Sequence, residues 1–483
     1  MTAAVTSRRA RADQCGVQVL GPSPDGGVRV STSVRRFFGS IEELPERAGA
    51  IVRGADGVAR LRGRLFPTAL VADPVLARTV LTHPTGFRQG RGVDVLRFTL
   101  GQGLLTSSGE LHRRQRRLVQ PAFHARRLAA YARDAVELGS ARCASWHDGQ
   151  RIDVAAEMSS LTLEVVGRTL FGTDVRDEVA IVSQAQHELL KVFPSLLTMR
   201  GMLGVRFPGR LRRTLRRESE RLDGVVERVV ATRRASGDAG DVVSLLLAAR
   251  DEETGEPMPA RQVRDEVLTL LLAGHETTAV ALSWAWLELG RNPVARSALD
   301  AELASPSGRE ALAGGVWDGL PVTRAIIAET LRLHPPAFQL GRRPTEDVVL
   351  GPYRFRRGTA VLISPYALHR DERSWGPDAE EFRPSRWLTD EGHFDEAAPG
   401  QPRGAYLPFG AGSRMCIGAG FAVMEGVLLL GRLAADWRVE FAAGFSPHVR
   451  PAVTLRTGPL PATLRAVRPS QREGRPDGGV CRD

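Results

Sequence analysis

Residues 408–420 read PFGAGSRMCIGAG, a stretch in which Cys416 stands among glycines and close to Arg414. An apolar helical pattern follows it. A cysteine just ahead of a helix start has free backbone N–H groups and a positive dipole end available to stabilise its thiolate. Glycines let the backbone approach a large, flat molecule without Cβ clashes. An inert buried cysteine needs neither feature, so the stretch predicts a thiolate that binds a ligand.

The composition of the chain narrows the class of protein. The net charge is +11 over 483 residues, but the arginines are spread along the whole chain and Lys191 is the only lysine. Nucleic-acid-binding tails concentrate their basic residues, so no nucleic-acid partner is expected. The four cysteines show no CxxC spacing, which argues against a zinc site or a disulfide framework. The N-terminal stretch lacks the apolar run of a signal peptide or membrane anchor, so we expect a cytoplasmic protein.

Hydrophobic periodicity predicts a mainly α fold with a small β component (α+β). Alternating stretches at 58–73 and 348–364 predict strands. The polar, Gly/Pro-rich ends predict disordered segments at 1–35 and 469–483, with a single domain at 36–468 between them. The segments with helical periodicity are Leu111–Val119, Leu128–Leu138, Met158–Leu170, Leu211–Arg234, Pro259–Arg291, Val322–Leu333 and Phe421–Leu433.

The longest predicted helix, residues 259–291, has a polar interruption at its centre. Its middle is apolar on nearly all sides, which indicates burial, yet residues 273–278 read AGHETT. Two interpretations stay open from these residues alone. One is a kinked core helix whose threonine hydroxyls bond back to the preceding turn. The other is a polar groove in which a hydroxyl and a carboxyl handle protons beside a bound molecule.

Two groups of charged residues are weaker signals. Glu329 and Arg332 stand three apart on a predicted helix, where acid–base pairs are common on solvated surfaces. Arg386, in an aromatic coil that reads FRPSRW, would turn this pair into a buried network if it reached Glu329. His112 and Arg116 lie one turn apart on another predicted helix, which suits a solvated basic helix as well as an anion site.

Taken together, the motifs resemble those of the cytochrome P450 family, the haem-thiolate monooxygenases. FGAGSRMCIG, AGHETT, ETLR and FRPSRW occur in the order and approximate spacing of that family, and the resemblance extends from about residue 35 to 468. It implies the cytochrome P450 fold, with the long helix over a haem and the cysteine loop beneath it.

The resemblance assigns residues to a haem b, iron protoporphyrin IX. Cys416 is implied to be the axial ligand of the iron, with Phe409 packed beside it. His112 is a variant, because many family members have Trp at its position. The other implied haem contacts are Gly418, Ala273 and the propionate-binding residues Arg414, His112, Arg116 and Arg342. A structural triad is implied for Glu329, Arg332 and Arg386.

The same resemblance implies a monooxygenase that uses O2 and two electrons to hydroxylate a lipophilic small molecule. Glu276 and Thr277 match the acid and the alcohol that the family uses to deliver protons. A haem-thiolate protein of another type, such as an isomerase, a dehydratase or a sensor, stays the alternative, although such proteins need no acid–alcohol pair.

Electrons are expected from separate proteins, because no flavin-binding segment or dinucleotide fingerprint is left over in the sequence. The resemblance implies a ferredoxin and its NAD(P)H-dependent reductase as partners of a monomeric enzyme. Exposed arginines are expected to dock the acidic ferredoxin, with Arg113, Arg114, Arg117 and Arg432 as candidates.

The substrate pocket is expected to be apolar, which favours a terpenoid first and a fatty-acid-like or polyketide-type molecule next, in bacterial secondary metabolism. Ordinary core packing is the alternative for each candidate contact. These candidates are Phe98, Leu196, Leu197, Met199, Met202, Leu270, Phe338 and Leu340.

Overall fold

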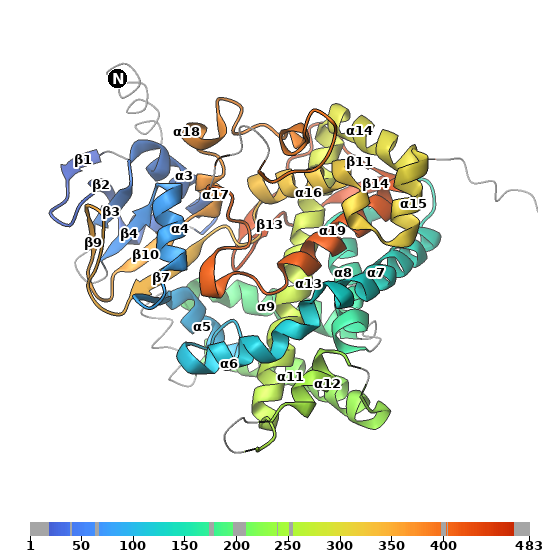
Figure 1. Ribbon diagram of the computed structural model, residues 1–483, viewed down its shortest axis with the longest axis horizontal. Helices are drawn as coiled ribbons and strands as arrows, with labels where there is room; N and C mark the ends of the chain where they lie inside the picture. Colours follow the sequence, from blue (N-terminus) through green and yellow to red (C-terminus); the bar gives the residue numbers. More distant parts are fainter. Residues whose placement is uncertain are drawn as a thin grey trace, which may run out of the picture.

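A computed structural model gives the architecture for residues 19–38, 41–62, 67–172, 178–196, 209–238, 240–250, 255–397, 402 and 404–467. Helices make up most of the described chain, and the larger sheet lies to one side of them (Figure 1). The mainly α fold with a small β component is therefore confirmed.

The larger sheet joins strands from both ends of the sequence. Its order is β1-β2-β3-β4-β10-β7-β5, and β10 pairs with β4 in parallel but with β7 antiparallel. Its strands are β1 (Val19–Pro22), β2 (Val28–Ser33), β3 (Val58–Arg62), β4 (Thr68–Val71), β5 (Phe87–Gln89), β7 (Leu340–Pro344) and β10 (Ala360–Ile363). The smaller sheets contain β6 (Arg151–Asp153), β11 (Trp437–Phe441) and β14 (Pro461–Ala466), then β8 (Val348–Leu350) with β9 (Tyr353–Phe355), and β12 (Arg450–Pro451) with β13 (Leu455–Arg456).

The prediction of disorder for residues 1–35 was wrong for its second half. Residues 1–18 lie outside the described residues, as do 468–483, but β1 and β2 form an antiparallel pair at the edge of the larger sheet. Val30 is buried in β2, because alternate side chains of this strand face the core. Gly21 and Pro22 lie in β1 itself, and Pro24, Gly26 and Gly27 lie in the β1–β2 turn.

Each predicted helix is present, with bounds that differ by a few residues. The helices are α2 (Val34–Phe37), α3 (Leu44–Gly54), α4 (Pro74–Thr82), α5 (Arg91–Leu100), α6 (Gly109–Val119), α7 (Ala125–Ser145), α8 (Val154–Phe171), α9 (Val179–Leu196), α11 (Arg210–Ser236), α12 (Val242–Ala248), α13 (Ala260–Arg291), α14 (Pro293–Ala304), α15 (Pro306–Gly314), α16 (Pro321–Leu333), α17 (Pro365–Leu368), α18 (Glu372–Trp375) and α19 (Ala419–Asp436).

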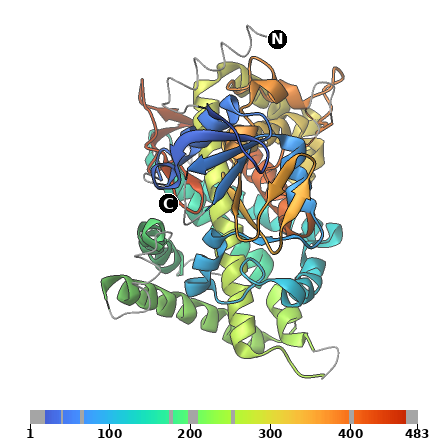
Figure 2. The ribbon, with the colours of Figure 1, turned by 90° about the vertical axis from the view of Figure 1, so that its left-hand side faces the viewer.

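Helix α13 runs through the middle of the molecule and passes behind the larger sheet in the view of Figure 2. It is long and apolar enough to cross a membrane, but 78% of its apolar window is buried inside the protein, which identifies it as a core helix. At Gly274 it approaches α8 so closely that an added Cβ would lie 3.2 Å from a methyl carbon of Val166. Packing against α8 therefore offsets the low helix propensity of this glycine.

Candidate active site

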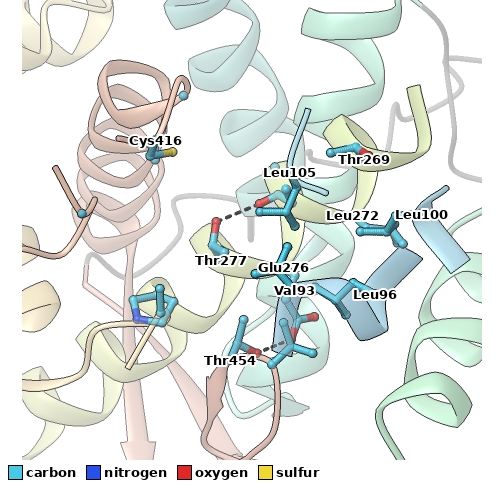
Figure 3. Close-up of a pocket in the computed structure, with 18 of the residues that line it drawn as sticks. Val93, Leu96, Leu100, Leu105, Thr269, Leu272, Glu276, Thr277, Cys416 and Thr454 are labelled. Carbon is cyan, nitrogen blue, oxygen red and sulfur yellow. Dashed lines mark hydrogen bonds between the residues drawn. The ribbon is translucent and has the colours of Figure 1, made fainter. Parts of the chain in front are cut away.

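A cavity of about 460 Å³ lies between α13 and the cysteine loop. Figure 3 shows Cys416 ahead of α19 on one side, with Glu276 and Thr277 of α13 on the other. Helix α5, helix α9 and the segment before β7 contribute most of the remaining wall, which is largely apolar. The structure therefore brings the two strongest motifs of the sequence, about 140 residues apart in the chain, to one cavity.

Cys416 presents its thiol to this cavity. Its backbone N–H donates to the carbonyl oxygen of Phe409 at 2.9 Å, which closes the loop, and both residues line the cavity. The residue has an accessible surface and lines the cavity. Burial raises the pKa of the Cys416 thiol, and this outweighs the lowering by the Gly418 N–H and by Arg116. The start of helix α19 alone therefore does not stabilise a thiolate at Cys416. A positively charged ligand atom would stabilise it.

The glycines of the cysteine loop are needed for different physical reasons. Gly412 has a φ of +72°, and an added Cβ would lie 2.5 Å from the carbonyl oxygen of Leu81 at the end of α4. This glycine is thus required by its turn and by packing against α4. Gly418 has no such backbone contact and lines the cavity, so the expected close approach to a flat ligand applies to Gly418.

Two arginine side chains, that of buried Arg342 and that of half-buried Arg414, border the cavity without a carboxylate partner among the described residues. Arg342 of β7 donates to the side chain of Gln89 at 3.1 Å, and Arg414 donates to the carbonyl oxygen of Ser107 at 2.8 Å. The Nη1 atom of Arg414 is buried and makes no hydrogen bond in the described structure. Burial lowers the pKa of each arginine to about 10. Two cations at the cavity wall without carboxylate partners in the described structure fit a ligand that carries two carboxylates, as haem does.

Helix α6 supplies the two other candidate propionate contacts. His112 is buried, and burial, with help from Arg414 and Arg116, lowers the pKa of its imidazole to about 4. It is therefore neutral near pH 7 and would bind a carboxylate as a neutral N–H donor. Arg116 donates from Nη1 to the carbonyl oxygen of Met415 at 2.8 Å, which ties α6 to the cysteine loop. Neither side chain is part of the cavity wall itself.

The polar interruption of α13 makes the back-bonds of the first interpretation and also faces the cavity. Thr277 donates from Oγ1 to the carbonyl oxygen of Ala273 at 2.9 Å, and Thr278 donates to that of Gly274 at 3.3 Å. These are the back-bonds expected of a core helix. Glu276 and Thr277 nevertheless both line the cavity, as does Ala273, so a carboxyl and a hydroxyl are available there.

The partners of Glu276 come from a part of the chain that the sequence did not single out. Thr454 donates from Oγ1 to Oε1 of Glu276 at 2.7 Å, as Figure 3 shows, and Nε of Arg456 lies 3.3 Å from the same oxygen. Both residues belong to the β12–β13 hairpin. Glu276 and Thr454 are buried, whereas the side chain of Arg456 is 31% exposed. Glu276 and Arg456 thus form a polar connection from the cavity towards the surface. Neither residue lies in a recognisable motif, so no sequence signal pointed to them.

Glu329, Arg332 and Arg386 meet in a buried network. Arg332 makes a bidentate ion pair with Glu329, at 2.7 Å for each hydrogen bond, and Arg386 reaches Oε1 of Glu329 at 3.1 Å. Trp387 donates from its indole N–H to the other carboxylate oxygen at 2.9 Å. Arg332 also donates to the carbonyl oxygens of His369, Ala379 and Glu381. Because these carbonyls lie in irregular coil, the network organises the chain that leads to the cysteine loop.

The predicted substrate contacts divide into three groups. Leu196, Leu270 and Leu340 line the cavity. Phe98 is 49% exposed and Phe338 is buried in the core beside the sheet, so neither belongs to the wall. Phe98 points away because the inner face of α5 is formed by other residues. Leu197, Met199 and Met202 lie outside the described residues. Wall residues that were not predicted include Val93, Leu96, Leu100, Leu105, Phe193, Thr269 and Gln339.

The comparisons with known proteins agree on one family. A sequence model described as Cytochrome P450 matches residues 56–459. Cyclooctatin synthase of Streptomyces melanosporofaciens is 41% identical over 401 residues, which cover 82% of this chain and 85% of the relative. Cyclooctat-9-en-7-ol 5-monooxygenase of the same organism is 38% identical and covers 82% and 86%. Pentalenene oxygenase of Streptomyces avermitilis is 35% identical and covers 83% and 88%.

Proposed function

The chain belongs to the cytochrome P450 family and is a monooxygenase, and on this premise we propose that it hydroxylates a terpenoid in bacterial secondary metabolism. The observation that carries the proposal is the likeness, over more than four fifths of the chain, to two enzymes named for the cyclooctatin skeleton and to one named for pentalenene. The largely apolar wall of the cavity supports it, because a hydrocarbon skeleton gains free energy when it leaves water for such a surface.

For the cofactor, we propose that Cys416 binds the haem iron through its thiolate. Arg342 and Arg414 would neutralise the haem propionates, with His112 and Arg116 as further donors from α6. When bound, the haem activates O2 with two electrons, so that one oxygen atom enters the substrate and the other leaves as water. The iron would also lower the pKa of the thiol, which burial alone raises.

Glu276 and Thr277 are proposed to supply the two protons that this reaction consumes. The Thr277 hydroxyl would turn from the carbonyl oxygen of Ala273 and present its proton in the cavity. The Glu276 carboxyl would replace that proton from the side of Arg456, whose partly exposed side chain reaches towards solvent. The surrounding apolar wall keeps bulk water away from the reacting carbon.

Electrons are proposed to come from a ferredoxin and its NAD(P)H-dependent reductase in the cytoplasm, with the monomeric enzyme as acceptor. Arg113 and Arg117 are exposed on α6, which also carries the propionate candidates. Arg113 and Arg432 each form an ion pair within their own helix, with Glu110 and Asp436, but Arg432 is a weaker docking candidate because its side chain is only 20% exposed, against 68% for Arg113. If reduction by ferredoxin were insensitive both to salt and to charge reversal at α6, this surface would be excluded.

The decisive experiment has two stages. The ferrous–CO spectrum of the haem-loaded protein should show the red-shifted Soret band of thiolate ligation. Terpenoid alcohols and hydrocarbons with polycyclic skeletons should then shift the spin state, and a reconstituted ferredoxin system should yield hydroxylated product. The protein could show the red-shifted Soret band and bind fatty acids but no terpenoid. This result would refute the substrate class and leave the haem assignment intact.

A further inference from the structure

The connection from α5 to α6 forms part of the cavity wall. We call residues 99–107 the strap. Thr99, Leu100 and Leu105 of the strap line the cavity, and Figure 3 shows Leu100 and Leu105 beside α13. Beyond the end of α5 at Leu100 the strap has no helix or strand of its own before α6 begins at Gly109. Its turn is closed by its own hydrogen bonds, such as that from the Ser107 N–H to the carbonyl oxygen of Gly103 at 2.9 Å, and bonds from other elements fix its place relative to the cavity.

Three consecutive residues of α13 supply such bonds. Arg264 donates from Nη1 to the carbonyl oxygen of Thr99 at 2.9 Å. Asp265 accepts the backbone N–H of Gln102 at 2.8 Å, and Glu266 accepts the backbone N–H of Leu104 at 2.9 Å. We call Arg264, Asp265 and Glu266 the clamp. Consecutive helical residues point in different directions, so the strap is held along its length rather than at one point.

The clamp residues are themselves fixed. Asp265 is 4% exposed and Glu266 is fully buried. Arg264 donates to Oδ1 of Asp265 at 2.9 Å and to Asp223 of α11 at 2.6 Å, which anchors its guanidinium group. Two adjacent buried carboxyl groups are costly in free energy, and a backbone N–H of the strap offsets part of that cost for each of them, beside Arg264 for Asp265 and Gln262 for Glu266. Apolar side chains could have filled the same space at lower cost, so the polar contacts indicate that the position of the strap matters.

Two glycines of the strap fit the clamp closely. A Cβ at Gly101 would lie 2.1 Å from Oδ2 of Asp265, and Gly101 has a φ of +60°. A Cβ at Gly103 would lie 2.2 Å from Oγ1 of Thr269 and 2.5 Å from the carbonyl oxygen of Asp265. Either side chain would force the strap away from α13, even with the clamp intact.

The other end of the strap is tied to the cofactor side of the cavity. The carbonyl oxygen of Ser107 accepts from Nη2 of Arg414 at 2.8 Å, and that of Gln102 accepts from the Gln115 amide of α6 at 2.7 Å. The strap thus connects an arginine proposed to bind the haem with the wall that faces the substrate. A change in the position of the strap would alter the space on the substrate side of the cavity but would leave the cysteine loop in place.

We propose that Arg264, Asp265 and Glu266 are positioning residues that set the shape of the substrate wall through the strap, and so determine which large ligands fit above the haem. The inference rests on the proposed function only in that it requires the haem at Cys416. The clamp touches neither the substrate nor the cofactor; it acts through Leu100 and Leu105.

Two azoles of different size test this inference in the haem-loaded protein, with the Soret shift as the readout. Imidazole reports ligation to the haem iron, and 4-phenylimidazole additionally reports the position of the wall. In Glu266→Leu and in Gly103→Ala, the dissociation constant for 4-phenylimidazole should change by about tenfold or more, while that for imidazole stays within about twofold. Glu266→Gln, which keeps an oxygen that can accept the Leu104 N–H, should resemble the wild type.

Gly92→Ala is the matched control, because this glycine of α5 has nothing within 4 Å of an added Cβ. It should leave both affinities unchanged. Equal changes for both azoles, or no change for either in both variants, would overturn the proposal. If Glu266→Leu does not fold, Gly103→Ala still decides. A ferrous–CO spectrum without the band of thiolate ligation would instead refute the haem assignment on which the proposal depends.

Discussion

The hydroxyl group of Thr454 donates to Oε1 of Glu276 at 2.7 Å, and both side chains are buried. This contact joins the β12–β13 hairpin to the centre of α13, 178 residues apart in the sequence. In the proposed proton relay, this hydrogen bond and the contact with Arg456 would orient the carboxyl group of Glu276.

Thr454→Val should therefore lower the share of NAD(P)H that ends in product, by a few fold, because Glu276 loses the donor that orients it. Substrate affinity should change little, since valine has nearly the shape of threonine. Product and NAD(P)H consumption are measured together in the reconstituted system. A variant with wild-type coupling would show that Arg456 alone suffices to hold Glu276.

Thr277→Ala should uncouple more strongly and release hydrogen peroxide, because it removes the hydroxyl that presents the proton in the cavity. The α13 backbone should be unaffected, since the lost contact is only a back-bond to Ala273. Peroxide formation per NAD(P)H is the measurement. Thr278→Ala, one residue further on, is the control, and it should remain coupled.

Arg414→Leu should lower haem retention, because a buried propionate would lose its cation and the carbonyl oxygen of Ser107 would lose its donor. The ratio of Soret to protein absorbance after gel filtration measures this loss. Arg261→Leu, at an exposed position of α13, is the matched control. Equal haem content in the two variants would contradict the role proposed for Arg414.

Glu425 gives the protein a pH-dependent stability. It is fully buried in α19, and burial raises the pKa of its carboxyl group to about 8, although Thr278 acts in the opposite direction. Because the folded protein holds this proton more tightly than the unfolded chain, the contribution is complete below about pH 4 and is lost as the pH rises to about 8.

Glu425→Gln removes this proton exchange. The free energy of unfolding of the wild type should fall by a few kcal/mol between about pH 5 and pH 8, and the variant should show a smaller fall. Some slope should remain, because burial also raises the pKa of Glu266 to about 7. Denaturant unfolding at several pH values measures the difference. Identical slopes would show that Glu425 is ionised in the folded protein.

The class of fold and the family of the protein could be predicted from the amino-acid sequence alone. The helical periodicity was strong over long segments, and each segment became a helix, because burial of an apolar face needs only local spacing. The cysteine loop and AGHETT carried their meaning in residue type and spacing, so the sequence was sufficient to expect both motifs at a haem.

The distant residues that contact these motifs could be identified only from the folded structure. Thr454 and Arg456 reach Glu276 through a hairpin, and the clamp meets the strap across more than 150 residues of sequence. The wall was predicted in part, because apolar residues such as Phe338 and Leu340 look alike in sequence, although one faces the core and the other the cavity. Side-chain hydrogen bonds and the direction of a side chain depend on how elements pack, and no local pattern encodes that packing.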